Sequence, residues 1–294
     1  MLRQIFLPVL FLLLLPAQSL PAQSEDGGSP AFTTVPELAT GFNLLYAQKF
    51  PEAREKFNDW NSRNPEEPFG QVAVAASYLF EELYRQGVLS SDFFLNEKRF
   101  LNGIDGKPDP SRIKSFEEAI ANGRRLAGQR LEKNLKDPEA LFALTLAAGM
   151  ESNADMILKK QHLESLKRLK EANEFAKRLL AEQPDADDAY VALGSANYII
   201  GSLSGGARFM LWFGGIHGDK KLGMQQMEKT AEKGRYLQPF AKILLALSAR
   251  REKQKALAQK LFRELSEEFP ESSLYAAEYA KAMGKLVPAE MKPQ

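Results

Sequence analysis

The chain holds two histidines, the side chains best suited to proton transfer near neutral pH, and their sequence settings differ. His162 lies four residues after Leu158, in a stretch whose pattern predicts one long amphipathic helix over Asp155–Glu182. On such an apolar stripe a histidine is expected to be structural. His217 stands two residues before Asp219, a spacing that could supply a base and its orienting carboxylate. No Ser or Cys nucleophile motif accompanies the pair, so we interpret His217 as a turn residue and expect no catalytic residue.

Carboxylates and glycines gather in several places, but none of these stretches matches a metal or phosphate motif. The acidic run Asp185–Asp188 stands where it can cap a following helix, and Glu264–Glu271 is interpreted as part of a solvated helix face. EF-hand spacing is absent, and the glycine-rich segment 201–218 lacks the G-x-x-x-x-G-K-[ST] phosphate loop. The chain has no Cys, which removes disulfides, Cys-based zinc sites and iron–sulfur clusters. The sequence therefore predicts no cofactor, no metal site and no enzyme activity.

Composition and charge narrow the class of protein further. The 294 residues are 44% hydrophobic, which is enough for a substantial core. Lys and Arg number 39 against 38 Asp and Glu, so the net charge is +1 and no broad basic field exists to attract phosphates. We therefore expect no nucleic-acid partner.

The first 24 residues have the composition of a secretory signal peptide. Arg3 is followed by the apolar run Ile5–Leu15, broken by Pro8, and then by small residues that would allow cleavage after Ser19 or after Ser24. The alternative is a permanent membrane anchor, but a span needs ~20 apolar residues and this run is shorter. We expect export, to the periplasm or out of the cell.

Residues 25–35 are predicted to form a disordered linker rich in Gly, Ser and Pro, and helical periodicity then extends over residues 36–286. In the middle of that region Tyr190, Leu193, Gly194 and Asn197 stand at offsets 0, 3, 4 and 7, so they share one face of a helix. Gly194 leaves room on that face for a second helix to approach closely. No stretch shows the two-residue alternation of a strand, and the fold is therefore predicted to be all-α.

This spacing resembles the first helix of a tetratricopeptide repeat, whose pattern runs W-x2-L-G-x2-Y, then A-x3-F, then P. A whole repeat matches at Gly41, Leu44, Phe50, Ala53, Phe57 and Pro65, and a further half-repeat at Ala258, Phe262, Leu265 and Pro270. The resemblance implies a right-handed superhelical solenoid of helix hairpins. Repeats of ~34 residues would give five to six hairpins over residues 36–286.

Two stretches interrupt the repeats, residues 87–112 and 201–218, and residues 287–294 are predicted to be a frayed tail. The second insert carries Arg208, Phe209 and Trp212 in a short apolar block between Gly pairs. Three interpretations stay open for it. It is a segment packed on the solenoid's own core, which we favour, or a lid that enters a groove or a partner, or a peripheral contact with a membrane surface.

The family resemblance implies binding and not catalysis, because tetratricopeptide superhelices hold peptides or partner helices on their concave face. Residues 198–268 also look like a group of exported bacterial repeat proteins. We predict a non-enzymatic scaffold that binds a protein or peptide in the cell envelope. The alternative is a transporter-accessory protein that binds a small ligand in a pocket closed by the 201–218 insert. The predicted partner-binding residues are Asp188, Val191, Ser195, Tyr198, Ile199, Arg208, Phe209 and Trp212.

Overall fold

The computed structural model describes residues 34–96, 99, 102–203 and 217–286, and within these residues the fold is all-helical, without a strand. The predicted all-α class is thereby confirmed, and the first helix begins at Pro36, where the helical pattern begins in the sequence. Among the described helices none is both long and apolar enough to cross a membrane. The predicted signal peptide and the predicted tail lie outside the described residues.

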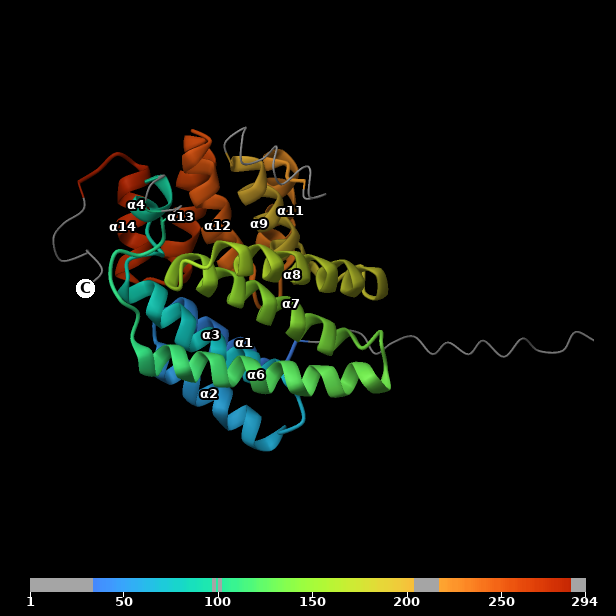
Figure 1. Ribbon diagram of the computed structural model, residues 1–294. Helices are drawn as coiled ribbons and strands as arrows, with labels where there is room; N and C mark the ends of the chain where they lie inside the picture. The colour runs from blue at the N-terminus through green and yellow to red at the C-terminus, as the bar shows by residue number, and fades with distance from the viewer. Residues whose placement is uncertain (1–33, 97–98, 100–101, 204–216, 287–294) are drawn as a thin grey trace, which may run out of the picture.

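The helices pack mainly on their neighbours in the chain (Figure 1). α1 packs on α2, α3 on α6, α7 on α8, α9 on α11 and α12 on α13, with α14 on α13. Their bounds are α1 Pro36–Tyr46, α2 Phe50–Arg63, α3 Pro68–Arg85, α4 Ser91–Leu95, α6 Pro110–Lys133, α7 Pro138–Asn153, α8 His162–Glu182, α9 Tyr190–Ser202, α11 Lys220–Lys233, α12 Gln238–Arg251, α13 Lys255–Glu268 and α14 Ser273–Ala282.

One backbone geometry recurs at the C-terminal ends of four helices. A residue with positive φ follows α1, α3, α12 and α14, and the next amide donates to a carbonyl five residues earlier, as in a Schellman cap. The four donor–acceptor pairs span 2.8–2.9 Å: Lys49–Leu44, Val88–Leu83, Gln254–Ala249 and Lys285–Ala280. Two of the positive-φ residues are Gly87 and Gly284, but Gln48 and Lys253 adopt the same conformation at φ 60°.

A second geometry recurs where the second helix of a pair ends. An extended residue caps α2, α6, α8 and α13. Its carbonyl accepts a hydrogen bond from the amide three residues later, at 3.0–3.2 Å, in the pairs Glu67–Asn64, Asp137–Asn134, Ala186–Gln183 and Ser272–Phe269. The next helix begins within a few residues, twice with Pro at its first position, where a missing N–H costs nothing. Residues far apart in the sequence thus repeat the same two turns.

Small residues stand where paired helices touch. A Cβ on Gly41 would lie 2.3 Å from the ring of Phe57 on α2. A Cβ on Gly194 would lie 2.7 Å from the carbonyl oxygen of Gly223 on α11, closer than any side chain allows. The predicted close approach at Gly194 is confirmed, and the reason is backbone-to-backbone contact.

The long helix predicted over Asp155–Glu182 is wrong. The end of α7 passes into a π-helical turn, Ala154–Leu158, and the chain turns at Lys160 with φ 58° before α8 begins. A residue from a distant loop stabilises this turn, because the amide of Ile104 donates to the carbonyl of Ile157 at 3.0 Å. His162 is consequently exposed at the start of α8, away from the core, and its ring contacts Met156.

Residues at and just after the C-terminal end of α1 contact the turns that precede α12 and α14. The hydroxyl of Tyr46 on α1 donates to the carbonyl of Tyr236, just before α12, at 3.0 Å. Gln48 contacts Ser272, and Lys49 forms an ion pair with Glu271. Eight rings pack around this junction and form what we call the aromatic cluster: Phe42, Tyr46, Phe69, Phe80, Phe142, Tyr236, Phe240 and Phe269.

Candidate partner-binding site

The aromatic cluster is part of the packed interior of the described residues. Phe42 and Phe142 lie 5.5 and 6.2 Å from the ring of Tyr236, measured between centroids. Burial raises the pKa of the Tyr236 hydroxyl to about 12, as expected for a phenol removed from water. In the described part of the chain, this interior is a packed core, and any binding surface has to lie elsewhere.

Asp188, one of the predicted partner-binding residues, is buried and bound to the backbone. Its carboxylate accepts hydrogen bonds from the amides of Arg235, Tyr236 and Leu237, at 2.8–3.2 Å, in the turn before α12. Burial raises the pKa of the Asp188 carboxyl, and these backbone donors act against that rise. Val191 is also buried. Both side chains tie α9 to its neighbours, and neither is exposed to a partner.

Ser195, Tyr198 and Ile199 come together around a small apolar pocket between α9 and α12. Leu244 and Leu247 line its other side, and the pocket holds about 50 Å³ of open space. The Tyr198 hydroxyl donates to Glu252 at 3.2 Å, and burial with the charge of Glu252 raises its pKa to about 12. Three of the predicted residues therefore share one site. Arg208, Phe209 and Trp212 lie outside the described residues.

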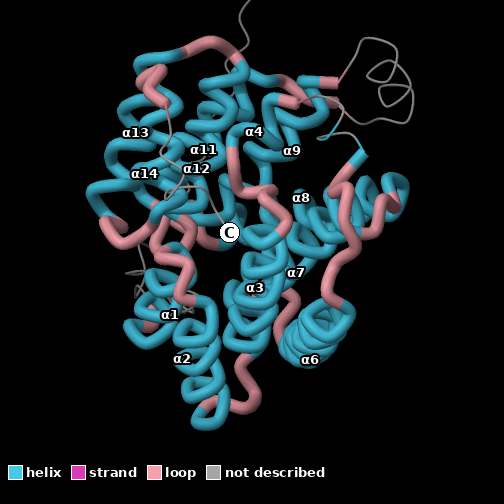
Figure 2. Tube along the Cα trace, turned by 90° about the vertical axis from the view of Figure 1, so that its left-hand side faces the viewer, coloured by secondary structure: helices cyan, strands magenta, loops and turns pink. Residues whose placement is uncertain are grey.

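A residue from the first insert also lines this pocket. It is Phe94, on the short helix α4. α4 packs on α12 in the fold (Figures 1 and 2). The sequence predicts turns in residues 87–112 and suggests that Phe93 and Phe94 pack down, but it does not place them on α12. Their partners lie far along the chain, and no local pattern reports them.

A larger, charged cleft lies between α6, the π-helical turn and the start of α8. It holds about 390 Å³ above an apolar floor of Phe116, Ile120 and Ala121. Its rim carries Glu117, Arg124, Glu151, Asp155, Lys159, Glu164 and Arg168. Sequence reasoning missed this cleft, because the turn at Lys160 that opens it interrupts a pattern read as one helix.

The charges of the cleft are arranged in pairs. Arg124 binds Glu171 through two hydrogen bonds, at 2.8 and 2.9 Å, and also donates to Glu151 at 2.7 Å. Lys159 lies 2.8 Å from Glu117. Burial lowers the pKa of Lys159, but the hydrogen bond and charge of Glu117 outweigh it, so the pKa is raised. The charged form of Lys159 is thereby stabilised.

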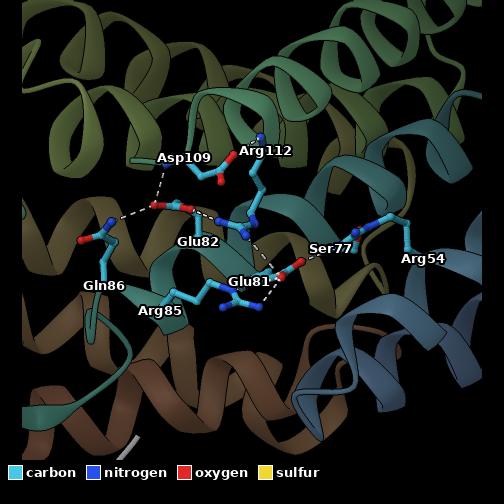
Figure 3. Close-up of polar contacts among 8 residues, drawn as sticks. All are labelled: Arg54, Ser77, Glu81, Glu82, Arg85, Gln86, Asp109 and Arg112. Atoms are coloured by element: carbon cyan, nitrogen blue, oxygen red, sulfur yellow. Dashed lines mark hydrogen bonds and ion pairs between the residues drawn. The ribbon is translucent and has the colours of Figure 1, made fainter. Parts of the chain in front are cut away.

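A second ion-pair network joins α2, α3 and α6 (Figure 3). Arg54 lies 2.6 Å from Glu81, and Arg112 pairs with Glu82, whose side chain is 1% exposed. Glu82 also accepts from the side chain of Gln86 at 2.9 Å. Figure 3 shows Arg54, Arg85 and Arg112 directed toward Glu81 and Glu82. Both carboxylates are buried, and we assign the network to packing.

The carboxylate that could orient His217 is engaged by a helix. The Asp219 carboxylate caps α11 by accepting from the amide of Leu222 at 3.0 Å, so it serves the helix. No group of three His, Asp or Glu side chains in the described ranges is arranged to hold a metal ion.

Comparison with known proteins adds no family to this description. No protein-family model matches the chain, and no curated protein matches it either. The features of the molecule that indicate a function are therefore the recurring turns, the pocket lined by Phe94 and Tyr198, and the charged cleft.

Proposed function

We propose that the chain is an exported, non-enzymatic repeat scaffold of the tetratricopeptide type, which binds a protein or peptide partner in the cell envelope. Support for the repeat class comes from the backbone. Four helices end in the same left-handed cap, and four others end in the same extended turn. Helix pairs repeated with constant turns are the structural unit of such arrays.

The observation that carries the binding proposal is the apolar pocket of Ser195, Tyr198 and Ile199, which an aromatic side chain from a distant segment, Phe94, helps to line. A few aromatic anchors in apolar pockets dominate the energetics of most protein interfaces. We infer that the outer surface of α9 and α12 serves partner binding, in place of a central groove.

Capture from the envelope fraction of the source organism, with mild cross-linking and mass spectrometry, tests this function. The baits are the wild-type chain, Ile199→Asp in the pocket, and Leu163→Asp as a control. Leu163 is 75% exposed on α8, away from the pocket. We expect a protein that the wild type and Leu163→Asp enrich and that Ile199→Asp loses. Identical enrichment by all three baits would contradict the proposed surface.

Export is tested by sequencing the N-terminus of the native protein. Cleavage after Ser19 or Ser24 gives a mature chain that begins at Leu20 or Glu25. Recovery of intact Met1 from the envelope fraction would rule out the proposed processing.

The alternative function is a transporter-accessory protein that binds a small ligand in a pocket closed by the 201–218 insert, and residues 204–216 of that insert lie outside the described residues. A small-ligand function is favoured by one observation at a different place, the charged cleft of about 390 Å³. Pockets of this volume suit small ligands, and its balanced charges suit a zwitterion. A panel of free amino acids in a thermal-shift assay tests this function, because a ligand at 100 times its Kd adds about 2.7 kcal/mol of stability. Arg168→Ala, on the rim of the cleft, should abolish any shift.

A further inference from the structure

The short helix α4 is held on α12 and α14 by polar contacts with two cations. Lys281 on α14 lies 2.7 Å from the carboxylate of Asp92, and Arg250 on α12 donates to the hydroxyl of Ser91. Both cations also form ion pairs with Glu278, which is 1% exposed and lies 2.9 Å from Lys281 and 3.5 Å from Arg250. The cations are thus prepositioned to meet a carboxylate.

The apolar part of the contact between α4 and the rest of the fold is the pocket that Phe94 helps to line. Leu244 and Leu247 of α12 face Tyr198 and Ile199 of α9 across it. About 50 Å³ stays open beside Phe94, so this ring does not fill the site. A closely packed core would leave no such space.

The outward contacts of α4 are weakly held. A helix of five residues is not stable alone, and Asp92 is 67% exposed, where an ion pair adds little stability. Phe94 is half-buried, while its neighbour Phe93 is fully buried in the core. Phe93 therefore anchors the segment, and the contacts of Asp92 and Phe94 are the ones that another segment can replace.

We propose that Arg250, Lys281 and the α9–α12 pocket form a docking site for a partner segment with a carboxylate two residues before a large aromatic side chain. α4 occupies this site as an internal ligand until such a partner displaces Asp92 and Phe94. The inference rests on the proposed function and names the chemistry of the partner. Two observations favour this partner. The positive charges of Arg250 and Lys281 complement a carboxylate, and α4 already places Asp92 and Phe94 at this site.

The test measures binding of a fluorescent peptide with the sequence Val88–Asn96 to the mature chain by anisotropy. Wild type and Phe94→Ala are compared, with Phe175→Ala, a half-buried ring on α8, as the matched control. Because an internal competitor lowers the apparent affinity by the fraction of open sites, we expect Phe94→Ala to bind about tenfold tighter or more. Phe175→Ala should match wild type.

Two altered peptides make the specificity testable. A peptide that carries Phe94→Ala should bind the Phe94→Ala protein at least about tenfold more weakly than the parent peptide, since it loses the aromatic anchor. A peptide that carries Asp92→Asn should bind about two- to fivefold more weakly, because the ion pair that it loses is exposed. Equal binding of all three peptides would overturn the inference. So would equal affinity of wild type and Phe94→Ala, or no binding by a Phe94→Ala chain whose circular dichroism matches wild type.

The outcome separates this inference from the proposed function. If the peptide fails to bind but envelope capture still depends on Ile199, the scaffold function stands and the acidic–aromatic recognition is wrong. If the peptide binds as expected but no envelope protein depends on Ile199, the docking chemistry stands and the proposed cellular role is wrong.

Discussion

The hairpins α3/α6 and α9/α11 are both interrupted by a long connection, yet their helices are joined in different ways. Buried ion pairs link α3 and α6, since Arg112 on α6 pairs with Glu81 and Glu82 on α3. Between α9 and α11 the backbones touch, and a Cβ on Gly223 would lie 2.5 Å from the amide nitrogen of Tyr198. The polar contact there is neutral, from Asn197 to Gln226 at 2.8 Å.

The difference shows two ways to hold a hairpin that has no tight turn to set its register. A charged network fixes register through the pairing of specific ions, and it fails when one ion is removed. A glycine contact fixes register through shape, and it fails when volume is added. Removing a charge should therefore affect α3/α6 more than α9/α11. Added volume affects both hairpins, because a Cβ on Gly123 of α6 would lie 2.7 Å from the side chain of Val72 on α3.

The largest effect is expected from Arg112→Met, which leaves the buried carboxylate of Glu82 without its cation. Breaking a buried pair in this way costs about 3–5 kcal/mol, and for a chain of this size each kcal/mol lowers Tm by about 2–4 °C. Arg125→Met, on an exposed position of the same helix, is the control. Thermal unfolding followed by circular dichroism provides the measurement.

A double variant sharpens the same test. Glu82→Met combined with Arg112→Met removes both charges and should recover much of the lost stability, because apolar residues of similar volume can replace a buried ion pair. If the double variant is as unstable as Arg112→Met alone, the cost comes from lost packing and the network does not join the helices as an ion pair.

Gly194→Leu should have the next largest effect. The added side chain meets the backbone of Gly223 and the side chain of Met227, so it overpacks the contact and costs about 3 kcal/mol, the upper end of the usual range. Gly128→Leu on α6 is the control, since a Cβ there meets nothing within 4 Å. A shift in Tm below 2 °C for Gly194→Leu would mean that α9 and α11 separate readily at this point.

The sequence predicts the helix pairs and the glycine contact because both depend on local spacing. Gly41 and Gly194 recur at repeat positions, and the structure places a paired helix against each. The role of Asp188 could be predicted only in part. A carboxylate that caps a helix is a local signal, but the amides that Asp188 binds are 47–49 residues away in the sequence.

Two features of the candidate site could not be predicted for the same reason. Lys281 meets Asp92 across 189 residues, so periodicity in either segment says nothing about the contact. The break at Lys160 depends on the Ile104 amide reaching the π-helical turn from another loop. Tertiary hydrogen bonding overrides a regular amphipathic pattern here.

The smallest effect, and the one most specific to the charged hairpin, is a dependence on pH. Burial raises the pKa of Glu81, but the hydrogen bond from Arg54 and the charges of Arg112 and Arg85 outweigh it and hold the pKa below the usual value of 4.5. A carboxyl whose pKa is lowered by folding stabilises the fold above 4.5, and that contribution is lost as the pH falls through its folded value.

Glu81→Gln removes this dependence and should lower the stability at pH 7 by about 1 kcal/mol, or roughly 2–4 °C in Tm. The difference from wild type should shrink as the pH falls below 4.5, because the wild-type carboxyl is then protonated as well. Glu55→Gln, on the exposed side of α2, controls for general charge effects. In hydrogen exchange of the wild type, acid should loosen α3 and α6 before α9 and α11, which are joined by glycine backbone contacts and by the amide side chains of Asn197 and Gln226. Equal loosening of both hairpins would show that ion pairing does not distinguish them.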